Sequence, residues 1–138
     1  MAETFELEVA TPERELVKDQ VEEAQIPGKN GYLGVLAGHA PLLTELGTGF
    51  MYYVIGGKRR YLSITGGFAE VLSDRVRILA DASERAEEID VERARQARER
   101  AQQQLLNAAL GVDPAAALAA IARAESRLEA AALGQADS

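Results

Sequence analysis

The side chains best suited to bind a ligand are arginines near the C-terminus that have no acidic neighbour on a helix. Side chains three and four positions apart are neighbours on a helix. Arg123 and Arg127 form such a like-charged pair, and neither has a carboxylate at these spacings. Arg100 also has none, whereas Arg93 follows Asp90 by three positions. Arginines gathered without local acids can bind phosphate groups through forked, charge-assisted hydrogen bonds.

Two other interpretations of these arginines remain open. They could simply solvate alanine-rich helices, because runs of surface charge are common. Arg98 also lacks a local acid, so the criterion is not specific. Alternatively, Arg123 and Arg127 could face an acidic surface of a partner protein. A helical hairpin with two positions would allow both the phosphate contact and the protein contact.

The composition excludes several other kinds of site. The 138 residues include 15 basic and 22 acidic side chains, a net charge of −7, so we expect no binding to nucleic acid. The absence of cysteine excludes disulfides, thiol nucleophiles and thiolate metal sites. His39 is the only histidine and no GxSxG motif is present, so we expect no catalytic residue and no metal site.

The chain has no recognisable targeting segment. Its acidic N-terminus has neither the basic start and apolar run of a secretion signal nor the arginines of a transit peptide. No apolar stretch approaches the roughly 18 residues needed to cross a bilayer. We therefore expect a protein that is made and kept in the cytosol, in contact with a membrane only through a partner.

Glycine and alanine divide the chain into two parts of different structure. Residues 1–84 hold ten of the twelve glycines, and residues 85–138 hold seventeen alanines. Glycine supplies turns, whereas alanine favours helix. We therefore predict an α+β fold: an N-terminal antiparallel β-sandwich or barrel over residues 1–85, then a C-terminal antiparallel two-helix hairpin over residues 86–138.

The strand prediction is based on alternation and turn residues. Apolar and polar residues alternate over Phe5–Val9 and again near Val76–Ala80. The pair Gly56-Gly57 follows an aromatic run and predicts a tight hairpin. We expect Gly66-Gly67 to separate two short strands, and Ser73-Asp74 to form the next turn.

The second part predicts two helices joined by a short connection. The helical pattern starts near Glu87, and Leu110-Gly111 is a stop signal. Asp113-Pro114 then offers an N-cap and a proline at the first helical position. The alanines at helical spacing are Ala94, Ala97, Ala101 and Ala108 on the first helix and Ala117, Ala124 and Ala131 on the second. Because alanine buries little area, we expect a weakly held hairpin that undocks at modest cost.

Several segments resemble the epsilon subunit of the bacterial F-type ATP synthase. The stretch GYLGVLAGHAPLLTELGTG (Gly31–Gly49) is similar to the most distinctive segment of that family, and Ile64–Asp90 continues the similarity into the linker. Ile89–Ala94 fits the family's nucleotide motif: an aliphatic residue, Asp, two variable residues, Arg and Ala. The resemblance covers nearly the whole chain and implies the same two-part fold.

The resemblance implies a non-catalytic rotor subunit of the central stalk, which helps to couple proton flow to ATP synthesis. The sandwich would bind the gamma subunit and the c-ring, with Tyr32, Leu33 and His39 as candidate contacts. The hairpin would inhibit ATP hydrolysis when extended, with Arg123 and Arg127 facing an acidic segment of the beta subunit. Such a protein would be peripheral on the cytoplasmic face of the bacterial cell membrane.

The resemblance also implies ATP as a regulatory ligand, with no cofactor required, because some bacterial members bind ATP while the hairpin is compact. Among the matching residues, the one glutamate and the one aspartate would shape the adenine pocket, the isoleucine and the alanine would form its walls, and the four arginines would hold phosphates. The matching residues are Glu84, Ile89, Asp90, Arg93, Ala94, Arg100, Arg123 and Arg127. Two alternatives remain: a free-standing ATP-binding sensor, and a small enzyme of the sandwich domain.

Overall fold

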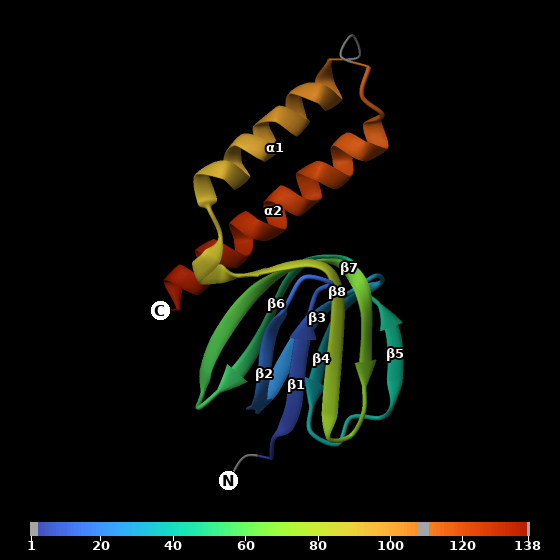
Figure 1. The fold of residues 1–138 in the computed structure, drawn as a ribbon, viewed down its shortest axis with the longest axis vertical. Coiled ribbons are helices and arrows are strands. Elements are labelled where there is room, and N and C mark those ends of the chain that lie inside the picture. Colours follow the sequence, from blue (N-terminus) through green and yellow to red (C-terminus); the bar gives the residue numbers. More distant parts are fainter. Residues whose placement is uncertain (1–2, 108–110, 138) are drawn as a thin grey trace.

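A computed structural model describes residues 3–107 and 111–137, which form a β-sandwich capped by a helical hairpin (Figure 1). The strands are β1 (Phe5–Ala10), β2 (Glu15–Val21), β3 (Glu23–Gly28), β4 (Gly31–Leu36), β5 (Leu42–Glu45), β6 (Thr48–Ile55), β7 (Lys58–Val71) and β8 (Arg75–Arg85). A 3-10 turn, η1 (Ala86–Glu88), leads to α1 (Val91–Leu106) and then α2 (Pro114–Ala136). The α+β fold is as predicted.

The strands follow one path, β2-β1-β8-β7-β6-β3-β4, and β5 pairs with β7. Every neighbouring pair is antiparallel except β1 with β8, which runs parallel and brings the first strand beside the last. The buried core between the sheet faces consists of residues from Phe5 to Ala80. Its largest fully buried side chains include Phe5, Leu7, Ile26, Met51, Leu62, Ile64 and Ile78. The described residues of the helices therefore add nothing to this core.

The two glycine pairs have different roles. Gly56 and Gly57, with φ of +58° and +77°, form the predicted tight turn between β6 and β7. The prediction that Gly66-Gly67 separates two strands is wrong, because β7 runs through both residues to Val71. A β-carbon at Gly67 would collide with the Leu79 carbonyl of β8, so the strand needs glycine where the two backbones approach.

The first helix begins later than predicted, and the second helix begins where it was predicted. The stretch near Glu87 forms η1, and α1 starts after Asp90, whose carboxylate accepts a hydrogen bond from the Arg93 N–H at 3.0 Å. Asp113 caps α2 as expected by accepting from the Ala115 N–H at 3.1 Å. The predicted stop begins at Leu110, which lies outside the described residues. No helix in the described ranges is long and apolar enough to span a membrane.

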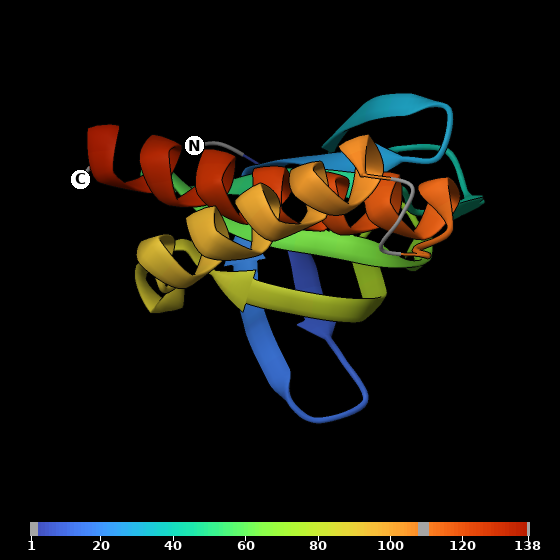
Figure 2. The same ribbon diagram turned by 90° about the horizontal axis from the view of Figure 1, so that it is seen from above.

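The hairpin stacks on the sandwich through α2. This helix crosses β6 and β7, and α1 packs on its other side (Figure 2). The seam between the helices is built from alanines that are at most 2% exposed, namely Ala94, Ala101, Ala117 and Ala124. Ala97 and Ala131 are partly exposed, and Ala108 lies outside the described residues. The other buried residues of α2 are Ser126 and Ala130, so all the residues that α2 itself buries are small.

Candidate functional site

A pocket of about 710 Å³ lies along the helical hairpin. Most of its lining comes from the first turns of α1, where residues three and four apart share a face. The lining residues are Asp90, Glu92, Arg93, Gln96, Ala97 and Arg100 at α1, and Arg127 from α2. Three of the four predicted phosphate-binding arginines therefore meet in one pocket.

Arg127 has an acidic partner that does not lie on its own helix. Its Nε donates to Oε1 of Glu84 at 2.6 Å, which ties α2 to the end of β8. The Glu84 N–H donates to the Ser63 hydroxyl at 3.1 Å, and the Ser83 hydroxyl donates to the Ser63 carbonyl at 2.6 Å. The strands thus fix the backbone beside Glu84, and Glu84 in turn positions Arg127 at the pocket.

The other three arginines that were predicted to bind phosphate have no ion-pair partner within 4.0 Å among the described residues. These are Arg93 and Arg100 in the pocket, and Arg123, which is exposed and lies one turn before Arg127. The Asp90 carboxylate binds the backbone at the start of α1. The lining holds three arginines and two acids, Asp90 and Glu92, and Arg127 is already paired with Glu84, so Arg93 and Arg100 are the pocket arginines without an ion-pair partner among the described residues.

Two predicted wall residues lie elsewhere. Ile89 is 8% exposed and lines a different cavity, where the hairpin joins the sandwich. Ala94 is fully buried in the seam between the helices. The prediction omitted Gln96 and Ala97, which the spacing from Arg93 could have indicated, since both lie one turn further along its face.

The predicted partner-binding residues of the sandwich do not form one cluster. The Tyr32 side chain is half exposed, with its ring 5.3 Å from that of Phe50. Leu33 packs against the core. His39 lies in the turn after β4, where its Nδ1 donates to the Ala40 carbonyl at 2.6 Å. The N–H of the neighbouring Gly38 donates to the Ser73 carbonyl. Ser73 belongs to the turn before β8, at the end of the sandwich away from the helices (Figure 1).

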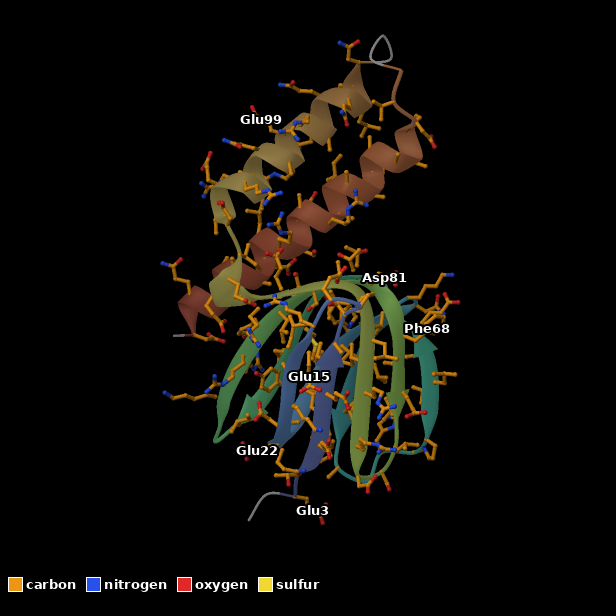
Figure 3. The ribbon with its side chains drawn as sticks, viewed as in Figure 1. Glu3, Glu15, Glu22, Phe68, Asp81 and Glu99 are labelled. Carbon is orange, nitrogen blue, oxygen red and sulfur yellow. The ribbon has the colours of Figure 1, made fainter. Side chains whose placement is uncertain are left out.

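An exposed apolar cluster on the sandwich was not predicted. Phe68 on β7 pairs with Leu79 on β8, and the two are 53% and 52% exposed. Leu43 on β5 lies opposite Glu70 and is 71% exposed. Figure 3 shows Phe68 on the flank of the sandwich beside β5. The sequence signal was the unbroken apolar run Ile78–Ala80, in which one residue must face outward.

Two further contacts hold the ends of the hairpin to the sandwich. Arg14 donates to both carboxylate oxygens of Glu88 at 2.8 and 3.0 Å, which anchors η1 and lowers the pKa of Glu88. The Tyr61 hydroxyl donates to Asp137 at 2.5 Å just beyond α2. Burial, together with this hydrogen bond, raises the pKa of Tyr61. In the described part of the chain, no group of three acidic or histidine side chains is placed to hold a metal ion.

Family models match both parts of the chain. Residues 4–86 match the beta-sandwich domain of the ATP synthase delta/epsilon chain, and residues 87–132 match its long alpha-helix domain. The chain is 64% identical over 128 residues to the ATP synthase epsilon chain of Solibacter usitatus, covering 93% of this chain and 96% of that one. It is 47% identical over 133 residues to the epsilon chain of Moorella thermoacetica, with the same coverage.

A solved assembly contains the same fold. A chain in the cryo-EM structure of the Euglena gracilis mitochondrial ATP synthase (OSCP/F1/c-ring) superposes with a TM-score of 0.80 at 30% identity. The match covers 94% of this chain and 81% of that one. Fold and sequence agree over both parts of the molecule, and the chain therefore belongs to the family of ATP synthase epsilon chains, the non-catalytic subunits of the enzyme's central stalk.

Proposed function

We propose that this chain is a rotor subunit whose sandwich binds the gamma subunit and the c-ring and whose hairpin regulates ATP hydrolysis. The exposed apolar cluster of Phe68, Leu79 and Leu43 supports a partner surface on the sandwich, because protein contacts cover exposed apolar patches of this kind. Tyr32 and His39 offer further contacts on and after β4. The protein would be peripheral on the cytoplasmic face of the bacterial membrane, held there through the complex.

In the compact arrangement, the pocket on the hairpin would bind ATP. The observation that carries this proposal is the convergence of Arg93, Arg100 and Arg127 on one pocket of about 710 Å³. Three guanidinium groups would offset part of the negative charge of a triphosphate, and Arg123 lies one turn before Arg127. Glu84 and Asp90 would border the adenine. A ligand that binds only the compact form stabilises it by RT ln(1 + [L]/Kd).

In the extended arrangement, the hairpin would leave the sandwich and inhibit hydrolysis. Arg123 and Arg127 would then exchange their compact-state surroundings for an acidic segment of the beta subunit. The small side chains between α2 and the sheet support this step, because alanine and serine bury little apolar area. ATP would oppose the step by holding the hairpin compact.

Calorimetric titration with ATP tests the nucleotide site. We expect saturable binding to the intact chain and at least about tenfold weaker binding by the variant Arg123→Ala/Arg127→Ala, which removes two charge-assisted contacts. Arg95→Ala is the matched control, since Arg95 pairs with Glu92 on the exposed face of α1. Unchanged affinity in the double variant would contradict the proposed phosphate contacts.

Two assays test the rotor and regulatory roles. The chain should co-purify with a folded gamma subunit, and failure to do so while ATP still binds would favour the free-standing sensor. In a reconstituted catalytic head, deletion of residues 89–138 should raise the rate of ATP hydrolysis. Equal rates of ATP hydrolysis with and without the hairpin would contradict the inhibitory role, and the proposed contacts of the sandwich with its partners would still stand.

A further inference from the structure

A second cavity, of about 780 Å³, opens where the hairpin joins the sandwich and shares no lining residue with the arginine pocket. Its walls come from β2, from the β6–β7 hairpin, from the linker around η1 and from the last turns of α2. A ligand in this cavity would contact both parts of the molecule at once. Ile89, one of the residues predicted to line the nucleotide site, lies here instead.

The β6–β7 hairpin aims one set of polar side chains toward this cavity. Tyr53 pairs with Arg60 across the two strands, so both side chains project from the same face of the sheet. Lys58 lies two residues before Arg60 and shares that face. Arg59 also lines the cavity, but its guanidinium stacks on the Tyr52 ring, with Cζ 4.2 Å from the ring centroid.

Several of these polar groups lack a partner within the described structure. Tyr53 is 7% exposed, yet its hydroxyl makes no hydrogen bond to any described residue. Neither Lys58 nor Arg60 has a carboxylate of the described chain within 4.0 Å, whereas Arg85 is occupied by the Leu16 carbonyl. A hydroxyl at a cavity that has no protein partner is free to bond a water or a ligand.

The rest of the lining decides what kind of ligand fits. Leu62 and Ile89 are buried apolar residues that border the cavity. Asp19, Glu87 and Asp137 also line it, and their charges would repel a polyphosphate. The cavity therefore combines two unpaired cations and a phenol donor with apolar walls and an acidic rim.

We propose that this cavity binds a singly charged organic anion with an apolar body. Its acid group would lie between Arg60, Lys58 and the Tyr53 hydroxyl, and its apolar body would rest on Leu62 and Ile89. Because the cavity spans the sandwich and both ends of the hairpin, such a ligand would favour the compact arrangement.

Fluorescence titration of the intact chain with 8-anilinonaphthalene-1-sulfonate, a singly charged aromatic sulfonate, tests this site. We expect saturable binding that is about fivefold weaker in Tyr53→Phe and in Arg60→Gln, each of which removes one hydrogen bond to the acid group. Arg95→Gln, on the exposed face of α1 and outside both cavities, is the matched control and should stay within about twofold. Arg93→Gln, in the other pocket, should bind the probe normally.

Three results would overturn the proposal. One is equal affinity in folded Tyr53→Phe, Arg60→Gln and Arg95→Gln variants, with folding checked by far-ultraviolet circular dichroism. Another is loss of binding in Phe68→Ser, which would place the probe on the exposed cluster of the sandwich. The third is equally tight binding of uncharged N-phenyl-1-naphthylamine, which would show that the acid group is not recognised.

Discussion

Arg127 is the residue at which the sandwich and the candidate nucleotide pocket meet. Its contact with Glu84 uses Nε, and neither terminal nitrogen is engaged with a described residue. The two side chains are 22% and 35% exposed, so water screens the pair only in part. Glu84 can therefore hold the guanidinium at the pocket while its terminal nitrogens remain available to a phosphate.

Replacing Glu84 tests this arrangement in the absence of nucleotide. In Glu84→Gln, we expect the free energy of opening α2 to fall by about 1 kcal/mol, because Arg127 loses a charge-assisted bond. Amide hydrogen exchange in α2 should then be about fivefold faster. Glu92→Gln is the control, since its pair with Arg95 is well exposed and should contribute less than about 0.5 kcal/mol. Exchange rates that match wild type in Glu84→Gln would contradict the prediction.

Glu88 makes the linker sensitive to pH. Arg14 holds the pKa of this carboxyl below its usual range, so its ionised form stabilises the folded chain. That contribution is complete above the unfolded pKa of about 4.3 and is lost as the pH falls through the lower folded value. The thermal midpoints of wild type and Glu88→Gln should differ at about pH 6, and the difference should shrink as the pH falls below about 4.3. A constant difference over this range would contradict the assignment.

At the scale of elements, the end of α2 packs closely on η1 because one of its residues has no side chain. A β-carbon at Gly134 would lie 2.6 Å from Cβ of Ala86, which is closer than packed carbons allow. The end of α2 therefore approaches η1 only because residue 134 has no side chain. Tyr61 and Asp137 complete this contact one turn later.

Gly134→Val should separate α2 from the linker while leaving the sandwich intact. We expect faster hydrogen exchange and proteolysis in the hairpin, because the valine methyl groups need space that Ala86 occupies. Ala132→Val introduces the same side chain on an exposed face and serves as the control. Equal protection of α2 from hydrogen exchange and proteolysis in both variants would contradict the prediction that the close approach of Gly134 limits docking.

At the scale of the whole molecule, the core belongs entirely to the sandwich. Among the described residues, none after Ala80 belongs to its buried cluster, so the strands bury their apolar faces without the hairpin. Small residues dominate the helical contacts, and each such residue contributes little apolar area. Stability is therefore unevenly distributed between the sandwich and the hairpin, as the proposed regulatory movement requires.

A fragment of residues 1–88 should fold cooperatively on its own. It keeps the core and the Arg14–Glu88 contact, and it loses the cover of α2 over β6 and β7 together with the Arg127–Glu84 and Tyr61–Asp137 contacts. Urea unfolding followed by circular dichroism should give one sigmoidal transition. A fragment of residues 1–85 should be less stable, because Arg14 loses its partner. A non-cooperative transition in the longer fragment would show that the hairpin is part of the folding unit.

Local sequence patterns determined the turns, the helix caps and the division of this chain into strands and helices. The Gly56-Gly57 turn, the Asp113 cap, the division into strands and helices, and the arginines without helical acids all depend on residues a few positions apart. Such short-range rules are readable without knowledge of distant contacts.

Only the tertiary structure decided which distant residues meet. Glu84 reaches Arg127 from 43 residues away, and β1 runs parallel to β8. Ile89 faces the junction with the sandwich instead of the arginine pocket. Periodicity tells which side of an element is apolar, but the partner of that side depends on how the whole chain packs, and that packing is set by many weak contacts acting together.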